Sequence, residues 1–172
     1  MKGWIPLLVL AVILIRCDDG AATREPAAPP GTFQMKLDGV QRVASSDKIG
    51  PSAYWDADLG TIQIDAFFAN QVNPDLYSHF SILLYDAKVG RFDIRGGELI
   101  QNVSTIFYNS EFGYTYSAVF AEGPISGVVF IHQMDLVNKF ISGSFKVNLA
   151  TSDKAQSHTI TAGSFTEIPI QP

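Results

Sequence analysis

The stretch Ile141–Ala150 reads ISGSFKVNLA, and its pattern determines the fold class that we expect. Apolar residues and glycine occupy every second position from Ile141 to Leu149, and serine, lysine and asparagine fill the positions between them. This alternation is typical of an antiparallel strand with one face in the core and the other in water. Thr61–Phe68 (TIQIDAFF) repeats the pattern, with Gln63 and Asp65 on its polar side.

Working outward from this stretch, further strands and turns follow one another along the chain. Residues 114–120 continue the alternation, residues 128–132 (VVFIH) predict a more central strand, and residues 158–160 and 165–170 predict a closing pair of segments around Gly163. Gly143 inside its strand predicts a bulge or a close backbone approach. The dipeptide Asp38-Gly39 predicts a tight hairpin. In the turn Val137–Lys139 we expect Asn138 to take a positive φ.

Residues 74–84 fit two structures. Asn73-Pro74-Asp75 resembles a helix start, which predicts a short helix near 74–84. Read at period two, Phe80, Ile82 and Leu84 share a face, and the strand-like segment Arg91–Ile94 that follows favours a strand. We therefore expect an all-β fold, a single antiparallel β-sandwich or closed-barrel-like domain of about eight to ten strands over residues 32–172.

Length and composition limit the alternatives. The 172 residues suit one domain, and 47% hydrophobic with 17% charged residues suit a packed core rather than a disordered chain. The single cysteine excludes an internal disulfide framework and a multi-cysteine zinc site.

The N-terminus predicts an export signal. Lys2 precedes an apolar run of 11 residues, Ile5–Ile15, interrupted only by Pro6. A membrane-spanning helix needs about 20 such residues, whereas a secretory signal needs about 7–15. We therefore assign residues 1–16 to a signal peptide.

Cys17 directly follows this run and is the predicted lipid-attachment residue. The segment Leu14-Ile15-Arg16-Cys17 resembles a bacterial lipoprotein signal, in which the cysteine is acylated, with palmitate among the chains, and becomes the first mature residue. Arg16 departs from the small residue usual at that position. An incidental thiol behind an uncleaved signal anchor is the alternative. Acylation would anchor the chain to a membrane without a spanning helix.

Residues 17–31 predict a flexible tether after the lipidated cysteine, because DDGAATREPAAPPG has three prolines and no hydrophobic periodicity. Asp18 and Asp19 resemble acidic sorting positions of lipoproteins and equally suit solvated linker charges. Removing residues 1–16 takes away two of the 12 basic residues and none of the 17 acidic ones, so the mature net charge is 10 − 17 = −7. This charge disfavours nucleic acid as a partner.

Short strings shared along the chain resemble an uncharacterised lipoprotein family common in Bacteroidetes. They are FQMKLDG (33–39), ILLYD (82–86), GRFDI (90–94), GVVFIHQMD (127–135), NKFISGSF (138–145) and ITAGSF (160–165). The resemblance implies lipoprotein status and an all-β fold. It transfers no catalytic residue, because members of that family are domains of unknown function.

Candidate metal and catalytic groups carry no decisive spacing. His79, His132 and His158 could form a metal site if their strands converge, and equally suit ordinary strand positions. Two oxygen-rich segments, 56–58 and 70–75, could hold calcium but also suit turns and caps. There is no Gly-x-Ser-x-Gly motif, and no pair of carboxylates stands out, so we predict no catalytic residue, metal or cofactor.

Five aromatic residues could form a ligand platform: Trp55, Tyr77, Tyr108, Tyr114 and Tyr116. Cross-strand tyrosine pairing explains them equally well. We therefore expect a non-enzymatic, lipid-anchored protein of the cell envelope, anchored in the outer membrane, whose β domain binds a small ligand, a glycan or a partner protein. An envelope hydrolase with loop carboxylates and a purely structural lipoprotein are the alternatives.

Overall fold

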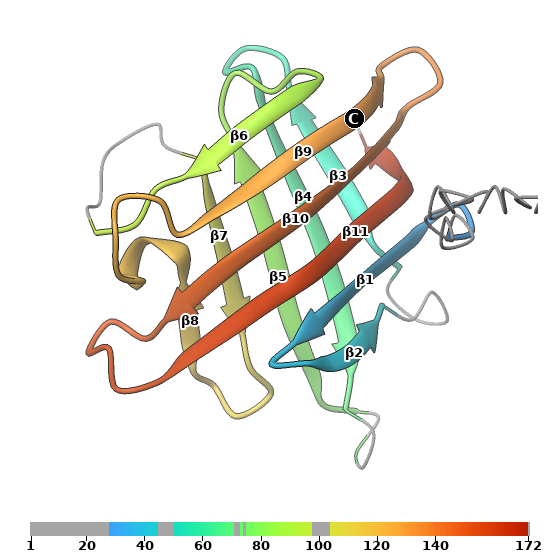
Figure 1. Ribbon diagram of the computed structural model, residues 1–172. Coiled ribbons are helices and arrows are strands. Elements are labelled where there is room, and N and C mark those ends of the chain that lie inside the picture. The colour runs from blue at the N-terminus through green and yellow to red at the C-terminus, as the bar shows by residue number, and fades with distance from the viewer. Residues whose placement is uncertain (1–27, 45–49, 71–72, 74, 98–103, 172) are drawn as a thin grey trace, which may run out of the picture.

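The computed structural model describes residues 28–44, 50–70, 73, 75–97 and 104–171, and this part of the chain contains eleven strands and one short 3-10 helix. The strands form two layers (Figure 1). The front layer contains β6 (Gly90–Ile94), β9 (Gly127–Asp135), β10 (Phe140–Ala150), β11 (Ser157–Gln171), β1 (Thr32–Leu37) and β2 (Val40–Val43). The back layer contains β3 (Ser52–Asp56), β4 (Thr61–Ala69), β5 (Tyr77–Leu84), β7 (Thr105–Asn109) and β8 (Thr115–Ser117). The predicted all-β class is confirmed, with one strand more than expected.

Two corners join the layers into a closed, flattened ring. At one corner, Ile170 and Gln171 of β11 pair in parallel with β3. At the other corner, Ala150 at the end of β10 pairs with Ser117 of β8. The remaining strand pairs are antiparallel. The fold therefore combines the two layers of a sandwich with the closure of a barrel.

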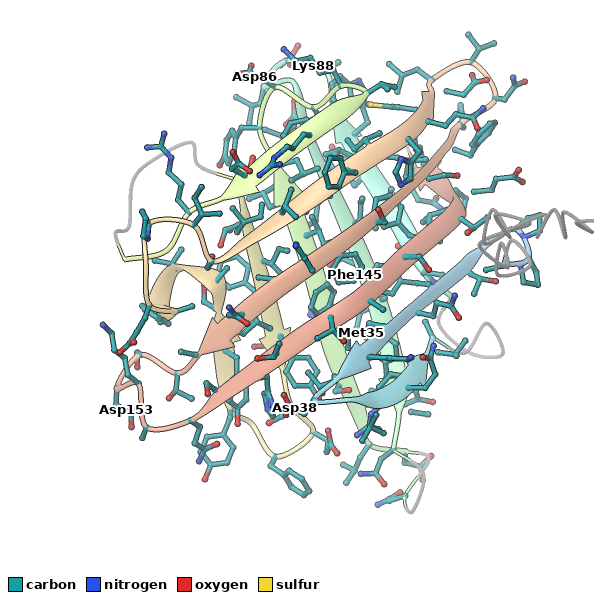
Figure 2. The ribbon with its side chains drawn as sticks, in the orientation of Figure 1. Met35, Asp38, Asp86, Lys88, Phe145 and Asp153 are labelled. Carbon is teal, nitrogen blue, oxygen red and sulfur yellow. The ribbon has the colours of Figure 1, made fainter. Side chains whose placement is uncertain are left out.

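The core lies between the layers and follows the predicted alternation. The odd-numbered residues Ile141–Leu149 of β10 are buried, as are Ile62, Ile64, Ala66 and Phe68 of β4. At the centre, the centroid of the Phe145 ring lies 5.4 Å from that of Phe33, also in the front layer, and 5.2 Å from that of Phe80 in the back layer. Aromatic contacts therefore join the two layers. Figure 2 shows Phe145 and Met35 near the middle of the front layer.

Two glycines let phenylalanine rings lie against the backbone. On paired strands, Gly143 is the direct partner of Phe165, and Gly163 is the direct partner of Phe145. A Cβ at Gly163 would overlap the Phe145 ring, and one at Gly143 would overlap both the Phe165 ring and the Phe130 carbonyl oxygen. The register also shifts between Ser142 and Gly143. The predicted close approach and bulge at Gly143 are both confirmed.

Residues 77–84 form strand β5, which resolves the ambiguity between helix and strand. Phe80, Ile82 and Leu84 are fully buried on one face, as period two predicts. The predicted pair of closing segments is wrong, because both belong to the single strand β11 of 15 residues. Gly163 does not interrupt β11, since the Phe145 ring fills the space that its missing side chain leaves.

Two local predictions also need correction. The alternation over residues 114–120 becomes a strand only at β8, and Ala118–Phe120 form a 3-10 helix instead. The Ser117 hydroxyl accepts a hydrogen bond from the Val119 N–H, which caps this turn and competes with strand pairing. In the β9–β10 turn the positive φ belongs to Lys139, not Asn138, because Asn138 donates to the Asp135 carboxylate from both its backbone and side chain.

The two ends of the molecule carry different loops. The β1–β2 turn with Asp38 and the β10–β11 loop with Asp153 lie at one end, which we call the Asp38 end, and Asp86 and Lys88 lie at the opposite end (Figure 2). Asp38 and Gly39 have φ of 49° and 81°, as a two-residue type I′ hairpin turn requires. The predicted hairpin is confirmed, and it forms one wall of the candidate site.

Candidate functional site

A cavity of about 340 Å³ opens at the Asp38 end, and we call it the rim pocket. The β1–β2 hairpin contributes one part of its wall, the β7–β8 hairpin another, and Gln156 and His158 complete it. The lining residues are Leu37, Asp38, Val40, Arg42, Tyr108, Ser110, Glu111, Phe112, Tyr114, Tyr116, Gln156 and His158. Ligand pockets commonly occur at the mouths of closed β-structures, and this volume is at the small end of their range.

Three rings from three strands form the aromatic part of the pocket. Tyr108 and Tyr116 are cross-strand partners with ring centroids 5.9 Å apart. The His158 ring lies 4.3 Å from Tyr116 and 5.6 Å from Tyr108. Both tyrosines are buried, and burial raises the pKa of each phenol. They therefore stay neutral, and the Tyr116 hydroxyl donates to the Gln156 side chain at 2.5 Å.

Two further rings stand at the mouth of the pocket. Phe112 and Tyr114 lie in the β7–β8 turn and are 75% and 51% exposed. Exposed aromatic side chains beside buried ones give the pocket an apolar surface that water covers poorly.

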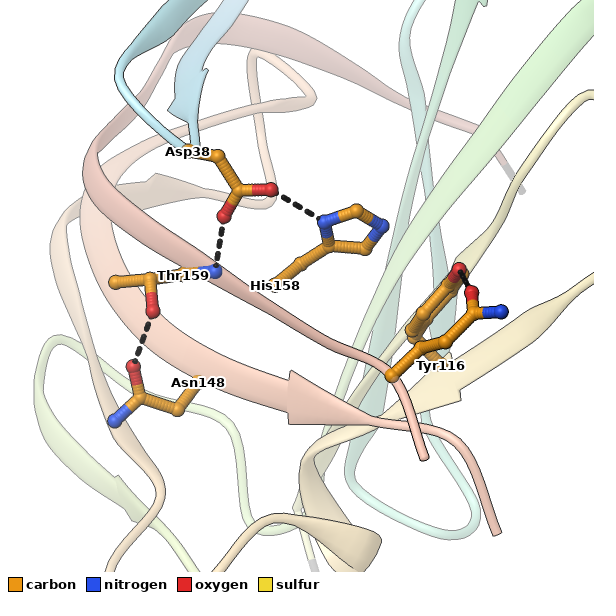
Figure 3. Close-up of polar contacts among 6 residues, drawn as sticks. Asp38, Tyr116, Asn148, His158 and Thr159 are labelled. Atoms are coloured by element: carbon orange, nitrogen blue, oxygen red, sulfur yellow. Dashed lines mark hydrogen bonds and ion pairs between the residues drawn. The ribbon is translucent and has the colours of Figure 1, made fainter. Parts of the chain in front are cut away.

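Asp38 holds His158 in one orientation (Figure 3). Its carboxylate accepts hydrogen bonds from the Thr159 N–H at 2.8 Å and from His158 Nδ1 at 2.6 Å. Partial burial raises the pKa of Asp38, but these two hydrogen bonds and the charge of His158 outweigh it, so the pKa lies below its ordinary value. Because an ionised carboxylate only accepts, Nδ1 carries the proton, and Nε2 remains for another partner.

Arg42 is the one residue in the pocket with an unmet hydrogen-bonding requirement among the described residues. It comes from β2, its side chain is partly buried, and its Nε atom is buried with no hydrogen-bond partner. The nearby carboxylate of Glu111 accepts from Asn70 Nδ2 instead. A buried N–H of a charged group without a partner is costly. Because the Nε has almost no exposed surface, a ligand acceptor would stabilise it only after the Arg42 side chain shifts toward the pocket that it lines.

Larger hollows lie elsewhere on the surface, but they differ in character. One of about 770 Å³ crosses the outer face of the front layer and is lined by side chains such as Gln34, Lys36, Lys146 and Ser164. Its lining includes Phe130 and two lysines, but it contains neither the tyrosine–histidine cluster nor, among the described residues, a buried polar side-chain atom without a partner. The rim pocket is therefore the better candidate site.

The three histidines are not brought together. His79 bonds Asp65 on the outside of the back layer, His132 bonds Ser144 on the outside of the front layer, and His158 lies in the rim pocket. Within the residues that the structure describes, no cluster of three or more His, Cys, Asp or Glu side chains could hold a metal ion. The three histidine side chains therefore do not meet, as a shared metal site would require.

The oxygen-rich segments form turns. The Asp56 carboxylate accepts from the N–H groups of Asp58 and Leu59. Asn70 accepts from the Asn73 N–H, and Asn73 accepts from the Asp75 N–H. These bonds account for the residue types without calcium.

Four aspartates of the described chain have a pKa shifted away from that of a catalytic acid. Hydrogen bonds hold the pKa of Asp38, Asp65, Asp135 and Asp153 below the ordinary aspartate value. A general acid at neutral pH needs a pKa shifted the other way.

Of the five predicted platform residues, the structure brings Tyr108, Tyr114 and Tyr116 together. Trp55 packs against the core from β3, and Tyr77 begins β5, both outside the rim pocket. Cys17, the signal peptide and most of the tether lie outside the described residues.

Sequence reasoning missed the rest of the pocket. Phe112, Arg42 and the Asp38–His158 pair were not predicted as site residues. Asp38 and His158 are 120 residues apart, so no local pattern signals their contact. The one available signal was the Asp38-Gly39 turn, which identifies the hairpin but not what it faces.

No helix within the described residues is long and apolar enough to span a membrane. Comparison with curated protein sequences and with solved structures finds no match. One family does match, over residues 75–169, which include β5 to β10 and most of β11. It is described as a domain of unknown function, in agreement with the uncharacterised family expected from the sequence, and it covers more than half of the chain. The chain therefore belongs to the family of the domain of unknown function DUF6252.

Proposed function

We propose that this protein is a lipid-anchored protein of the cell envelope whose β domain binds a small ligand in the rim pocket and catalyses no reaction. The observation that carries the binding function is the buried, unpartnered Nε of Arg42 beside an aromatic surface. Small-molecule sites are mostly apolar, with a few polar groups that fix the orientation of the ligand. The rim pocket has this composition.

The rings at the mouth support the same proposal. Phe112 and Tyr114 expose most or half of their surface to water although apolar burial is favourable. A ligand seated in the pocket would cover them. Because they lie in a hairpin turn and not in the core, their identity contributes little to folding, which leaves binding as a reason for two large rings there.

The hydrolase alternative receives less support. Acid–base hydrolysis needs one carboxyl group that stays protonated near neutral pH. The shifted carboxyl groups of the described chain are all lowered. The Asp38–His158 pair could orient a base, but within the described residues no serine, threonine or cysteine side chain forms a hydrogen bond with the His158 ring.

The binding function can be tested on the full chain in detergent micelles. Small molecules are screened for binding, and the binding is followed by nuclear magnetic resonance. Binders should shift the amide signals of Tyr114, Gln156 and other rim-pocket residues. Tyr114→Ala should weaken binding about tenfold, which corresponds to about 1.4 kcal/mol. Tyr54→Ala is the matched control, because Tyr54 is 52% exposed on β3 and lies outside the pocket. Signals that shift only outside the pocket, or equal weakening by both variants, would refute the proposal.

The anchor is tested separately, with radiolabelled or alkyne-labelled palmitate in cells. The full chain should incorporate the label and sediment with membranes, whereas Cys17→Ser should do neither. Arg16→Ala should increase the fraction of cleaved chain, since it restores a small residue before the cysteine. Unchanged labelling in Cys17→Ser would show that the lipid-anchor assignment is wrong.

A further inference from the structure

We infer that the ligand of the rim pocket is an uncharged saccharide of one or two rings, bound through both its hydroxyl groups and its C–H face. This inference rests on the proposed binding function and names the ligand class. Three features of the pocket support it: the mixture of donors and acceptors, the aromatic rings and the volume.

The charged groups of the pocket have opposite requirements. Arg42 can only donate hydrogen bonds, and its Nε lacks an acceptor. Asp38 and Glu111 line the same cavity and can only accept when ionised. Asp38 already accepts from His158 Nδ1 and from the Thr159 N–H, and Glu111 accepts from Asn70 Nδ2. Each carboxylate keeps further lone pairs.

A ligand with a single charge can pair with Arg42 or with the two carboxylates, but not with both. An organic anion would pair with Arg42 but would face two carboxylates at close range. An amine would pair with the carboxylates but would face Arg42 and leave its Nε without an acceptor. A hydroxyl group both donates and accepts, so a polyhydroxylated ligand can satisfy Arg42 and the carboxylates together without adding a charge.

A purely apolar ligand fits less well for a related reason. It would cover the rings but would displace water from Arg42, Asp38 and Glu111 without replacing its hydrogen bonds. Desolvating polar groups in this way is unfavourable. The ligand must therefore have a polar edge as well as an apolar face.

The rings provide the surface for the apolar face. Phe112 and Tyr114 are exposed at the mouth, and Tyr116 lies deeper beside His158. The C–H groups of a saccharide ring form a nearly flat apolar face that can pack on such rings. The cavity of about 340 Å³ limits the ligand to one or two rings.

His158 adds a defined position for one hydroxyl. Because the Asp38 carboxylate accepts a hydrogen bond from Nδ1, Nε2 is the ring atom left to hydrogen-bond a ligand hydroxyl, which can both donate and accept. Gln156 is oriented by the Tyr116 hydroxyl, which leaves its amide N–H groups as donors. These two side chains add to the mixture of hydrogen-bond donors and acceptors in the pocket.

The test titrates the full chain with glucose, galactose, mannose and N-acetylglucosamine, and in parallel with glucuronic acid, glucosamine and the uncharged apolar dye N-phenyl-1-naphthylamine. Calorimetry and amide shifts give the affinities. We expect at least one neutral sugar to bind at least about tenfold more tightly than glucuronic acid and glucosamine. Phe112→Ala, at a 75% exposed turn position, should weaken that sugar about tenfold without affecting folding.

The outcomes separate the two proposals. If the dye, the acid or the amine binds in the rim pocket and no neutral sugar does, the saccharide inference is overturned while small-ligand binding stands. If no probe shifts a rim-pocket signal, both fail. Arg42→Gln provides a second check, since it keeps donors but removes the charge. Neutral sugars should lose less than about threefold in affinity, and a larger loss would show that binding depends on the charge of Arg42, which would overturn the inference.

Discussion

Gly163 and Gly143 each lie beneath a phenylalanine ring of the neighbouring strand, and this arrangement leaves no room for a side chain at either position. The sequence alone identified Gly143 as a close approach but could not identify the ring above it. Pairing with Phe165 depends on the register of β10 against β11, which two short bulges alter.

Gly163→Ala should destabilise the fold by about 1–3 kcal/mol, because a methyl group there would displace the Phe145 ring from the core. Urea unfolding of the full chain measures the change. Ala162→Ser, at the exposed neighbouring position, is the control and should change stability by less than about 0.5 kcal/mol. Equal stabilities of Gly163→Ala and the native chain would show that the ring does not pack on this glycine.

Asp65 couples stability to pH at a single residue. Burial raises its pKa, but hydrogen bonds from His79, Ser81 and Gln63 outweigh burial and lower it. The folded state therefore binds fewer protons at Asp65 than the unfolded state does. Its stabilisation is present above the unfolded pKa of about 3.9 and is lost as the pH falls toward the lower folded value.

Asp65→Asn should therefore be less stable than the native chain by about 1 kcal/mol at pH 7. Its stability should also fall less steeply between about pH 5 and pH 2, because one carboxylate no longer takes up a proton on acid unfolding. Thermal unfolding across this range measures both quantities. An identical acid dependence in the two proteins would contradict a lowered pKa at Asp65.

At the scale of elements, the alternation of apolar and polar residues predicted strands well where a strand has a partner strand on each side in the sheet. It succeeded for β4 and β10, which are central and have one buried face. It failed after β8, where Ser117 caps a 3-10 turn, and it could not show that β11 continues through Gly163. Pattern reports which face is buried, whereas the length of a strand depends on partners far away in the sequence.

The position of each strand in the sheet predicts its hydrogen-exchange protection. β10 has partners on both edges, whereas β2 and β6 end the sheet order and have a partner on one edge only. Amides of Phe145 and Val147 should exchange at least about a hundredfold more slowly than those of β2 and β6, because they require global opening. Exchange measured residue by residue by magnetic resonance checks this order. Uniform protection across all strands would contradict it.

At the scale of the whole molecule, the rim pocket exists because the two layers close on each other. Its residues come from β1, β2, β7, β8, β11 and the adjoining turns, so no single element contains the site. Three of its tyrosines were recognisable from their residue type. Arg42 and the Asp38–His158 pair were not, because only the closed ring places the β1–β2 hairpin against β11 and the β7–β8 hairpin.

Closure also predicts that both layers unfold together. With Trp4 replaced by phenylalanine, Trp55 on β3 becomes the only tryptophan and reports on the back layer. Its fluorescence and the far-ultraviolet circular dichroism should give the same urea midpoint, as expected for two-state unfolding of a small domain. Ile168→Ala, at a fully buried β11 position, should lower both midpoints together and cost about 2–5 kcal/mol. Two separate midpoints would show that the layers are independent.

The partnership of β11 with β1, β3 and β10 also governs when the chain can fold. Phe33 in the first strand pairs with Phe165, so β1 has only its hairpin partner β2 until translation has passed Phe165. Until then the edges of β1 and β3 can pair with other chains, and contacts this distant in sequence form slowly. A nascent chain of this topology therefore stays incompletely folded until β11 has been made, and a ribosome stalled before Ser157 releases a product prone to aggregate.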